Sequence, residues 1–99
     1  GHTPSTSQYV SVMMELLDAV HTEYYASAPP HVFIACGPMT SAYCTAAQAA
    51  VTAAKAAGYS NTHFHQFTGI ALNGCIAHPN RDGMAAMATQ IEPKVRAAL

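Results

Sequence analysis

The sequence predicts a mixed α/β domain built on a parallel, doubly wound sheet, and three observations lead to that class. Two short runs rich in β-branched and aromatic residues, 31–36 and 61–67, have the composition of strands. Helical patterns occupy the stretches before, between and after these runs, so the predicted order is α-β-α-β-α. A helix between two strands is the βαβ arrangement, in which the strands run parallel and the crossover is right-handed.

The first helix is predicted to begin within residues 3–8 and to stop by Ser27. Ser5 and Gln8 have the spacing of a capping box, which satisfies the free N–H groups of a first helical turn. The tripeptide 28–30, Ala-Pro-Pro, cannot continue a helix. Between these limits, apolar residues recur at helical spacing and form one broad stripe: Tyr9, Val10, Met13, Leu16, Leu17, Val20 and Tyr24.

The segment 31–36, HVFIAC, lies between Pro30 and Gly37 and is apolar almost throughout. Such a run predicts a strand buried on both faces, as in parallel sheets. Residues 42–57 are nearly all strong helix formers, and Gly58 follows them as a C-terminal cap.

After the second strand, an irregular loop over 68–79 leads to a last helix over 80–98. Two strands are too few for a stable sheet, because buried parallel strands need neighbours on both sides. The 99 residues are therefore expected to be the back half of a doubly wound domain, incomplete on its own. A missing N-terminal half or another protein chain would cover the sheet.

Composition excludes several classes of partner. Ninety-nine residues suit one domain, and only 9% of them are charged. The basic residues are too few to neutralise phosphates, so no nucleic acid is expected; they are Lys55, Arg81, Lys94 and Arg96. The longest alanine-rich stretch, 46–57, is shorter than the roughly 18–20 apolar residues of a membrane span, so no transmembrane segment is expected.

His78 stands on the loop that leaves the carboxyl end of the second predicted strand, the side of a parallel sheet where ligands bind. Pro79 follows it directly, and a helix begins next. Two interpretations remain open at this point. His78 is either a residue beside a helix cap with no chemical role, or a catalytic base at the edge of the sheet.

A metal site is the weaker hypothesis for the other histidines. His63 and His65 alternate along a strand, so they share a face and offer two nitrogens. No third ligand has a fixed position, although His78 or Cys75 could approach. A polar sheet face near a cleft or an interface explains the pair better, and neither a metal nor a cofactor is expected. The histidines interpreted as structural are His21 and His31.

Two ordered motifs resemble a known enzyme family. The pattern GC-x-x-HPN-x-x-G-M-x-x-M-A over 74–88, preceded by VFIACGPM over 32–39, resembles the C-terminal half of SGNH/GDSL-type serine hydrolases. It is most similar to the carbohydrate O-acetyl esterases of that superfamily. The opening GHTPSTSQYVSVMMELL is similar to the segment after the family's Gly-x-Asn-Asp block, so the resemblance covers essentially the whole chain.

The resemblance implies that 1–99 is the C-terminal portion of a single SGNH hydrolase-like domain with a flavodoxin-like fold. It implies that His78 is the catalytic base of a serine esterase acting on acyl esters, commonly acetyl groups on carbohydrates. It implies no cofactor. A non-catalytic relative, kept as a structural or accessory subunit of a larger assembly, is the alternative.

The sequence departs from the family in two ways. The nucleophilic Ser of the Gly-Asp-Ser block and the Gly and Asn of the oxyanion hole are absent. The family's usual Asp, two or three residues before the His, is replaced by Ile76 and Cys75. A backbone carbonyl in the 73–77 loop is therefore expected to hold the second ring nitrogen of His78. The isolated chain is expected to hydrolyse nothing.

The cysteines Cys36, Cys44 and Cys75 match no zinc spacing, and they fit either one disulfide or three buried thiols. The resemblance implies a bridge between Cys44 and Cys75, which would tie the His78 loop to the body and leave Cys36 as a free buried thiol. Such a bridge would favour a secreted protein or an organelle lumen.

Overall fold

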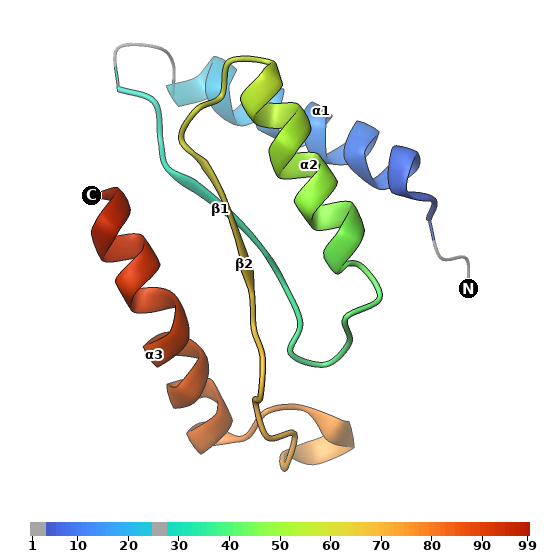
Figure 1. Ribbon diagram of the computed structural model, residues 1–99, viewed down its shortest axis with the longest axis vertical. Helices are drawn as coiled ribbons and strands as arrows, with labels where there is room; N and C mark the ends of the chain where they lie inside the picture. The colour runs from blue at the N-terminus through green and yellow to red at the C-terminus, as the bar shows by residue number, and fades with distance from the viewer. Residues whose placement is uncertain (1–3, 25–27) are drawn as a thin grey trace. The chain divides into compact units, whose positions relative to one another are not determined.

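The computed structural model describes residues 4–24 and 28–99 and has the predicted alternation of helices and strands. Its elements are α1 (Thr6–Tyr24), β1 (Val32–Cys36), α2 (Cys44–Ala56), β2 (Thr62–Gln66), a short 3₁₀ turn η1 (Cys75–Ala77) and α3 (Arg81–Ala98) (Figure 1). The helix end predicted at Ser27 lies outside the described residues. None of the helices in the described ranges combines the length and apolarity that a membrane crossing needs.

The two strands are neighbours and run parallel, as predicted, with α2 as the connection between them. The Val32 N–H donates to the Asn61 carbonyl oxygen at 2.9 Å, and the Phe67 N–H donates to the Cys36 carbonyl oxygen at 3.0 Å. The pairing thus advances in the same direction along both strands. The α/β class is confirmed, while a two-stranded sheet is too small to define a flavodoxin-like order.

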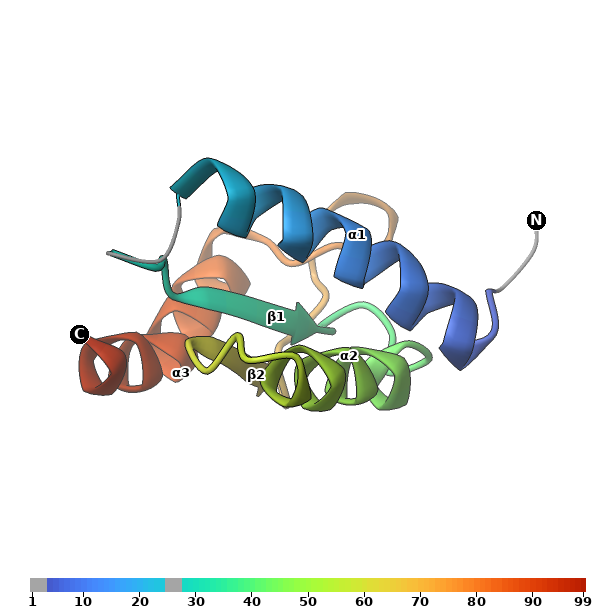
Figure 2. The ribbon, with the colours of Figure 1, turned by 90° about the horizontal axis from the view of Figure 1, so that it is seen from above.

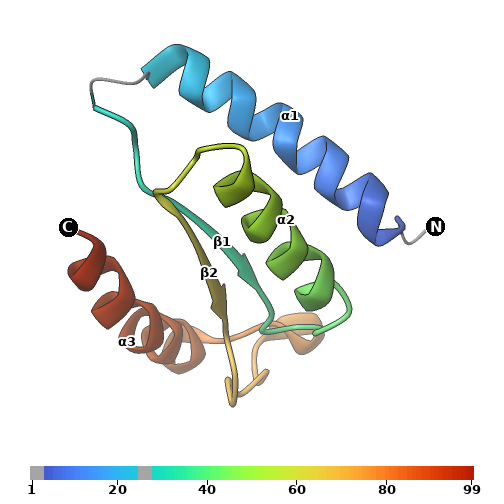
Figure 3. The same cartoon turned by 45° about the horizontal axis from the view of Figure 1, so that its top comes forward.

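The chain divides into two compact units. Unit 1 comprises 1–34 and 45–64, and unit 2 comprises 35–44 and 65–99. In unit 1, α1 lies next to α2 (Figures 2 and 3). The buried side chains of these two helices are small apart from Leu17, which lets the backbones approach closely; they are Leu17, Ala46, Ala47, Ala50, Val51 and Ala54.

In unit 1, the start of α1 and the end of α2 are as the sequence predicts. The Gln8 N–H donates to Ser5 Oγ at 3.1 Å, and the Ser5 N–H donates to Gln8 Oε1 at 2.8 Å, which is a complete capping box. At the end of α2, Gly58 has φ +98°, a left-handed conformation that glycine adopts without strain. The Tyr59 N–H then donates to the Ala54 carbonyl at 2.9 Å, closing the helix in a Schellman arrangement.

The predicted burial of the first strand on both faces is wrong. Ile34 and Cys36 are buried, but Ala35 between them is exposed. Because alternate side chains of a strand point to opposite faces, the described residues cover one face of β1 here and leave the other open. A parallel strand is buried on both faces only where a layer packs on each side of the sheet.

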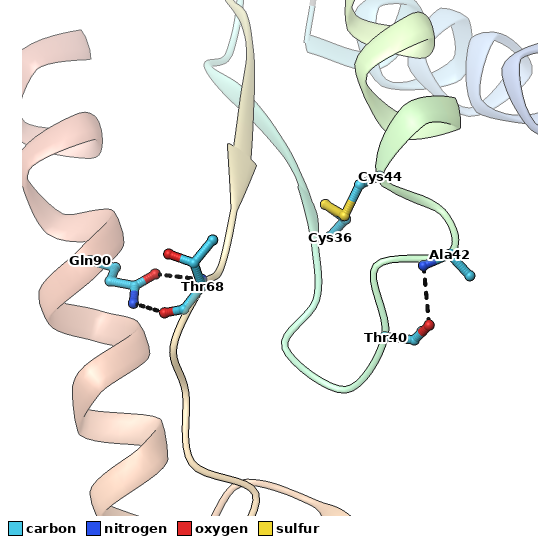
Figure 4. The surroundings of a disulfide bond; sticks show 6 residues. All are labelled: Cys36, Thr40, Ala42, Cys44, Thr68 and Gln90. Atoms are coloured by element: carbon cyan, nitrogen blue, oxygen red, sulfur yellow. Dashed lines mark hydrogen bonds between the residues drawn. A yellow bond between two sulfur atoms is a disulfide. The ribbon is translucent and has the colours of Figure 1, made fainter.

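In unit 2, α3 is fastened to the segment that follows β2. The Thr68 N–H donates to Gln90 Oε1 at 3.1 Å, and Gln90 Nε2 donates to the Thr68 carbonyl oxygen (Figure 4). The helix continues through Pro93 to Ala98. Its first turn is capped by Asn80, whose Oδ1 accepts from the Gly83 N–H at 3.0 Å.

Candidate functional site

The His78 loop has an unusual backbone. Ile76 has φ +53° and ψ +48°, and Ala77 has φ +54°, so two consecutive side-chain-bearing residues adopt the left-handed conformation. This conformation is costly for an L-residue, and most of all for a β-branched one such as Ile76. The Gly74 N–H donates to the His78 carbonyl at 2.7 Å and closes the loop. Strain of this kind is concentrated at functional sites in proteins.

The strained loop directs two carbonyl groups at one nitrogen of the His78 ring. Nδ1 lies 3.0 Å from the Cys75 oxygen and 2.9 Å from the Ile76 oxygen. Carbonyl oxygens only accept hydrogen bonds, so we assign the proton of the neutral ring to Nδ1, which leaves the lone pair on Nε2. The expected carbonyl contact from the 73–77 loop is therefore present. His78 is exposed, and no carboxylate contacts it among the residues that the structure describes.

Gly74 is required by the close approach of the loop to itself. A Cβ atom at this position would lie 2.8 Å from the His78 oxygen and 3.0 Å from the Pro79 oxygen. At Gly83, a Cβ would lie 2.9 Å from the Ala71 oxygen. Both glycines thus allow the loop to pack tightly, and Asn80 performs the capping of α3. His78 takes no part in that cap.

A pocket of about 430 Å³ opens beside His78 within unit 2. Its walls come from the turn after β1, from the His78 loop and from α3, and they consist of Pro38, Met39, His78, Pro79, Met84 and Met87. Among these residues His78 alone is ionisable. The pocket is therefore apolar, with one imidazole in its wall.

Sequence reasoning missed the methionines of this pocket. Met39 lies in the turn between β1 and α2, whereas Met84 and Met87 are three residues apart and share a face of α3. The GPM and GMAAM segments indicated such a pocket, because methionines at helical spacing beside a candidate catalytic loop can line one of its walls. What could not be read from spacing was that the two segments meet.

The predicted pairing of Cys44 with Cys75 is wrong, and so is the prediction that Cys36 is a free thiol. Cys36, at the end of β1, is bonded to Cys44, at the start of α2, with their Cα atoms 5.2 Å apart (Figure 4). Cys75 is an exposed free thiol. The physical reason is local: the turn between β1 and α2 reverses the chain and returns it beside the strand end. The disulfide therefore fixes the turn that carries Met39.

The histidines of the metal hypothesis have other surroundings. His63 Nε2 lies 3.0 Å from His31 Nδ1, and the His63 ring stacks on Phe33 with centroids 4.6 Å apart. An N···N contact of that kind shares one proton between the two rings, so the hydrogen bond uses the lone pair that a metal ion would need. In residues 4–24 and 28–99, no three His, Cys, Asp or Glu side chains gather around a possible ion. Spacing gave no indication that His31 meets His63.

His65 is buried, and its Nε2 has no hydrogen-bond partner among the residues that the structure describes. Burial, and to a lesser degree the positive charge of Lys94, lowers the pKa of His65 below the ordinary value of 6.5. The neutral ring packs edge-on against Phe67, with centroids 4.5 Å apart. His65 therefore serves as a packing residue.

His21 is structural in its observed contacts. Its Nδ1 lies 2.8 Å from the Leu17 carbonyl oxygen, and its ring stacks on Tyr59 at 3.9 Å. Tyr59 in turn donates to Asp18 Oδ1 at 2.5 Å. That hydrogen bond, with desolvation and the carboxylate charge as smaller causes, raises the pKa of Tyr59 above 10.0. These contacts link α1 to the end of α2.

Comparison of the chain with protein-family models, curated proteins and solved structures finds no match.

Proposed function

We propose that this chain is the C-terminal part of an SGNH-type serine esterase and that His78 is its catalytic base. The observation that carries the proposal is the pair of carbonyl contacts to His78 Nδ1 at 3.0 and 2.9 Å. They hold the ring in one tautomer and one orientation, which is the task of the acid in a catalytic triad. A backbone that accepts left-handed strain at Ile76 to achieve this supports a functional role over an incidental one.

In the proposed reaction, a serine hydroxyl from a segment outside these 99 residues attacks the ester carbonyl carbon while His78 Nε2 removes its proton. The tetrahedral intermediate then expels the alcohol, which receives that proton from Nε2. Water repeats the sequence on the acyl-enzyme: Nε2 takes one of its protons, the acid is released, and the proton returns to the serine. The Cys75 and Ile76 carbonyls stabilise the imidazolium in both halves.

In the family that the HPN and GPM motifs resemble, the ester is commonly an acetyl group on a carbohydrate, and this supports an acyl ester of a carbohydrate as the substrate. In this proposal, a segment or chain outside these 99 residues would also bring the oxyanion donors and cover the open face of the sheet. A disulfide between Cys36 and Cys44 favours an oxidising compartment.

The decisive experiment is labelling with a fluorophosphonate probe, applied to the protein expressed from its complete gene. We expect one serine to be labelled, and His78→Ala and His78→Gln to reduce the labelling rate at least about 100-fold, within the range of general-base catalysis. The matched control is His31→Ala, which removes another exposed imidazole. Unchanged labelling in both His78 variants would refute the assignment.

The alternative is a non-catalytic accessory subunit with an SGNH-like fold. The observation in its favour is that His78 lacks a carboxylate partner among the described residues. Under this hypothesis the protein from the complete gene takes up no fluorophosphonate at all, although its His78 ring keeps both carbonyl contacts. The labelling experiment therefore distinguishes the two.

A further inference from the structure

The pocket beside His78 has a chemistry that the acetyl-carbohydrate expectation does not explain. A sugar-binding surface needs hydrogen-bonding groups for hydroxyls, because a polar group that loses water without a partner weakens binding. The side chains that form these walls are prolines and methionines, with His78 as the exception. The lining thus favours an apolar occupant.

The size of the pocket leads to the same conclusion. Its volume of about 430 Å³ falls in the range of roughly 300–1,000 Å³ that is typical of sites for whole small-molecule ligands. An acetyl group has a single methyl beyond its carbonyl carbon and would fill only a small part of this space. A longer alkyl chain would fill it.

The methionines suit a flexible chain. Methionine is unbranched and polarisable, so several of them adapt to an irregular apolar ligand. Met84 is 64% exposed and Met39 is 49% exposed, which leaves apolar side chains in water beside an ionisable group. Met39 comes from the turn that the disulfide holds, and Met87 from the same face of α3 as Met84. A bound alkyl chain would bury all three.

We propose that this pocket binds the acyl chain of the ester, and that the acyl group is a saturated chain of medium length in place of acetyl. The inference rests on the proposed function, since it takes His78 as the group next to the ester carbonyl. The alkyl chain of the ester lies against Met39, Met84 and Met87, and its carbonyl end lies at His78. Selectivity then comes from the walls of unit 2.

The chain contains internal controls for a binding experiment. Its five methionines can be labelled with ¹³C in the ε-methyl group and observed by NMR. With octanoate as the probe, we expect the methyl signals of Met39, Met84 and Met87 to shift in a saturable manner. Met13 and Met14 on α1 belong to unit 1 and should not move. Equal shifts at all five methyls, or no shift at any, would overturn the proposal.

Chain length gives the second measure. Each methylene that leaves water strengthens binding by about fourfold. Because the pocket walls are partly exposed, we expect octanoate to bind only about 10- to 100-fold more tightly than acetate, less than full burial would give. Equal dissociation constants for the two acids would overturn the proposal, because the alkyl chain would then gain nothing from contact with the pocket walls.

A charge in the wall tests the location. Met84→Asp should weaken octanoate binding at least about tenfold, because a carboxylate repels the probe and removes apolar surface. Val12→Asp is the matched control, since Val12 is a helical residue of similar exposure, 66%, in unit 1. Comparable weakening in both variants would overturn the assignment of the site.

Hydrolysis separates this inference from the proposed function. In the protein from the complete gene, we expect p-nitrophenyl octanoate to be cleaved with a higher kcat/KM than the acetate ester, and Met84→Asp to reverse the order. If the acetate ester is cleaved faster and Met84→Asp does not change the rates, the acyl pocket is refuted while the proposed esterase function stands. Octanoate binding without any fluorophosphonate labelling would refute the esterase while leaving the alkyl-binding pocket.

Discussion

Two residues before His78, Ile76 carries the clearest conflict between side chain and backbone in the described chain. Its φ of +53° disfavours a β-branched residue, and its side chain is 89% exposed, so packing does not compensate. The benefit is local: the turn brings the Ile76 carbonyl to His78 Nδ1. A residue that tolerates the left-handed conformation should therefore keep the contact and remove the cost.

Ile76→Asn should raise the free energy of unfolding by about 1 kcal/mol, because asparagine occupies the left-handed conformation more readily than isoleucine. Urea denaturation followed by circular dichroism measures the change. Val12→Asn, at an exposed helical position, serves as the control and should be neutral or slightly destabilising. A loss of stability in Ile76→Asn would mean that the exposed side chain has a partner.

His65 should make the protein less stable in mild acid. Its pKa is lowered in the folded state, so the unfolded chain binds the proton more tightly. The contribution of the neutral His65 ring to the free energy of unfolding is complete above the unfolded-state pKa of 6.5. It decreases as the pH falls toward the lower folded-state pKa. The slope is at most about 1.4 kcal/mol per pH unit. Unfolding at pH 7 and pH 5 should show the loss, and His65→Leu should reduce it; an identical pH dependence in the variant would contradict this account.

At the level of elements, the features that the sequence predicted correctly were local. Ser5 and Gln8 define the start of α1, and Gly58 ends α2, because each acts on its own helix turn. The partner of Cys44 and the walls of the pocket depend on where the chain returns after a turn, which spacing does not encode. The carbonyl contacts of His78 lie between these cases. The sequence predicted them because no aspartate precedes His78 where the resembling family has one, but the strained turn that makes them could not be predicted.

Proteolysis should identify the disulfide. Trypsin cleaves after Lys55 and Arg81, so Cys36 and Cys44 lie in one peptide and Cys75 in the next. Without reduction, we expect mass spectrometry to find the two peptides separate, with only Cys75 alkylated. A covalent pair of 1–55 and 56–81 would contradict the Cys36–Cys44 bridge, because Cys75 would then be bonded to one of these two cysteines.

The same disulfide should stabilise the turn between β1 and α2. Loop-closure entropy for a separation of 8 residues predicts a loss of about 2–3 kcal/mol when Cys36 and Cys44 are both changed to alanine. Thermal unfolding and urea titration measure the loss. Cys75→Ser, which alters an exposed thiol, is the control and should change stability by less than about 0.5 kcal/mol.

Gly74→Ala should disturb His78 without touching its ring. The new methyl would lie 2.8 Å from the His78 oxygen, so the loop must open, at a cost of about 1–3 kcal/mol. We expect the ¹⁵N shifts of the ring to show that Nδ1 no longer carries the proton exclusively. Gly58→Ala is strained as well but lies at the end of α2, so it should leave the His78 signals unchanged. Unaltered His78 signals in Gly74→Ala would show that the loop does not orient the ring.

On the scale of the whole molecule, β1 and β2 form a two-stranded sheet in the described residues, which gives each strand one unpaired edge. Sheets of this size rarely stand alone. The open face at Ala35 points to the same need for a further layer. Both features support the proposal that another segment or chain completes the structure around His78.

The 99-residue chain by itself should therefore hydrolyse neither p-nitrophenyl acetate nor the octanoate ester above the buffer rate. An imidazole without a nucleophile and oxyanion donors has little catalytic power. Release of p-nitrophenol, followed by absorbance, provides the measurement. Turnover that disappears in His78→Ala would place the nucleophile within these residues. It would overturn the proposal that the serine comes from another segment.

The side-chain amide of Gln90 imitates a neighbouring strand. It engages both the N–H and the carbonyl of Thr68, while the preceding Phe67 N–H is turned toward β1. Because backbone groups alternate in direction, the Thr68 groups face away from β1, on the outer side of the chain just beyond the end of β2. Any strand that docks there must therefore stop before Thr68 or displace the amide. Gln90 thus limits how far an added strand can extend along this side of the chain. It also occupies backbone groups that could otherwise pair with unrelated chains and start aggregation.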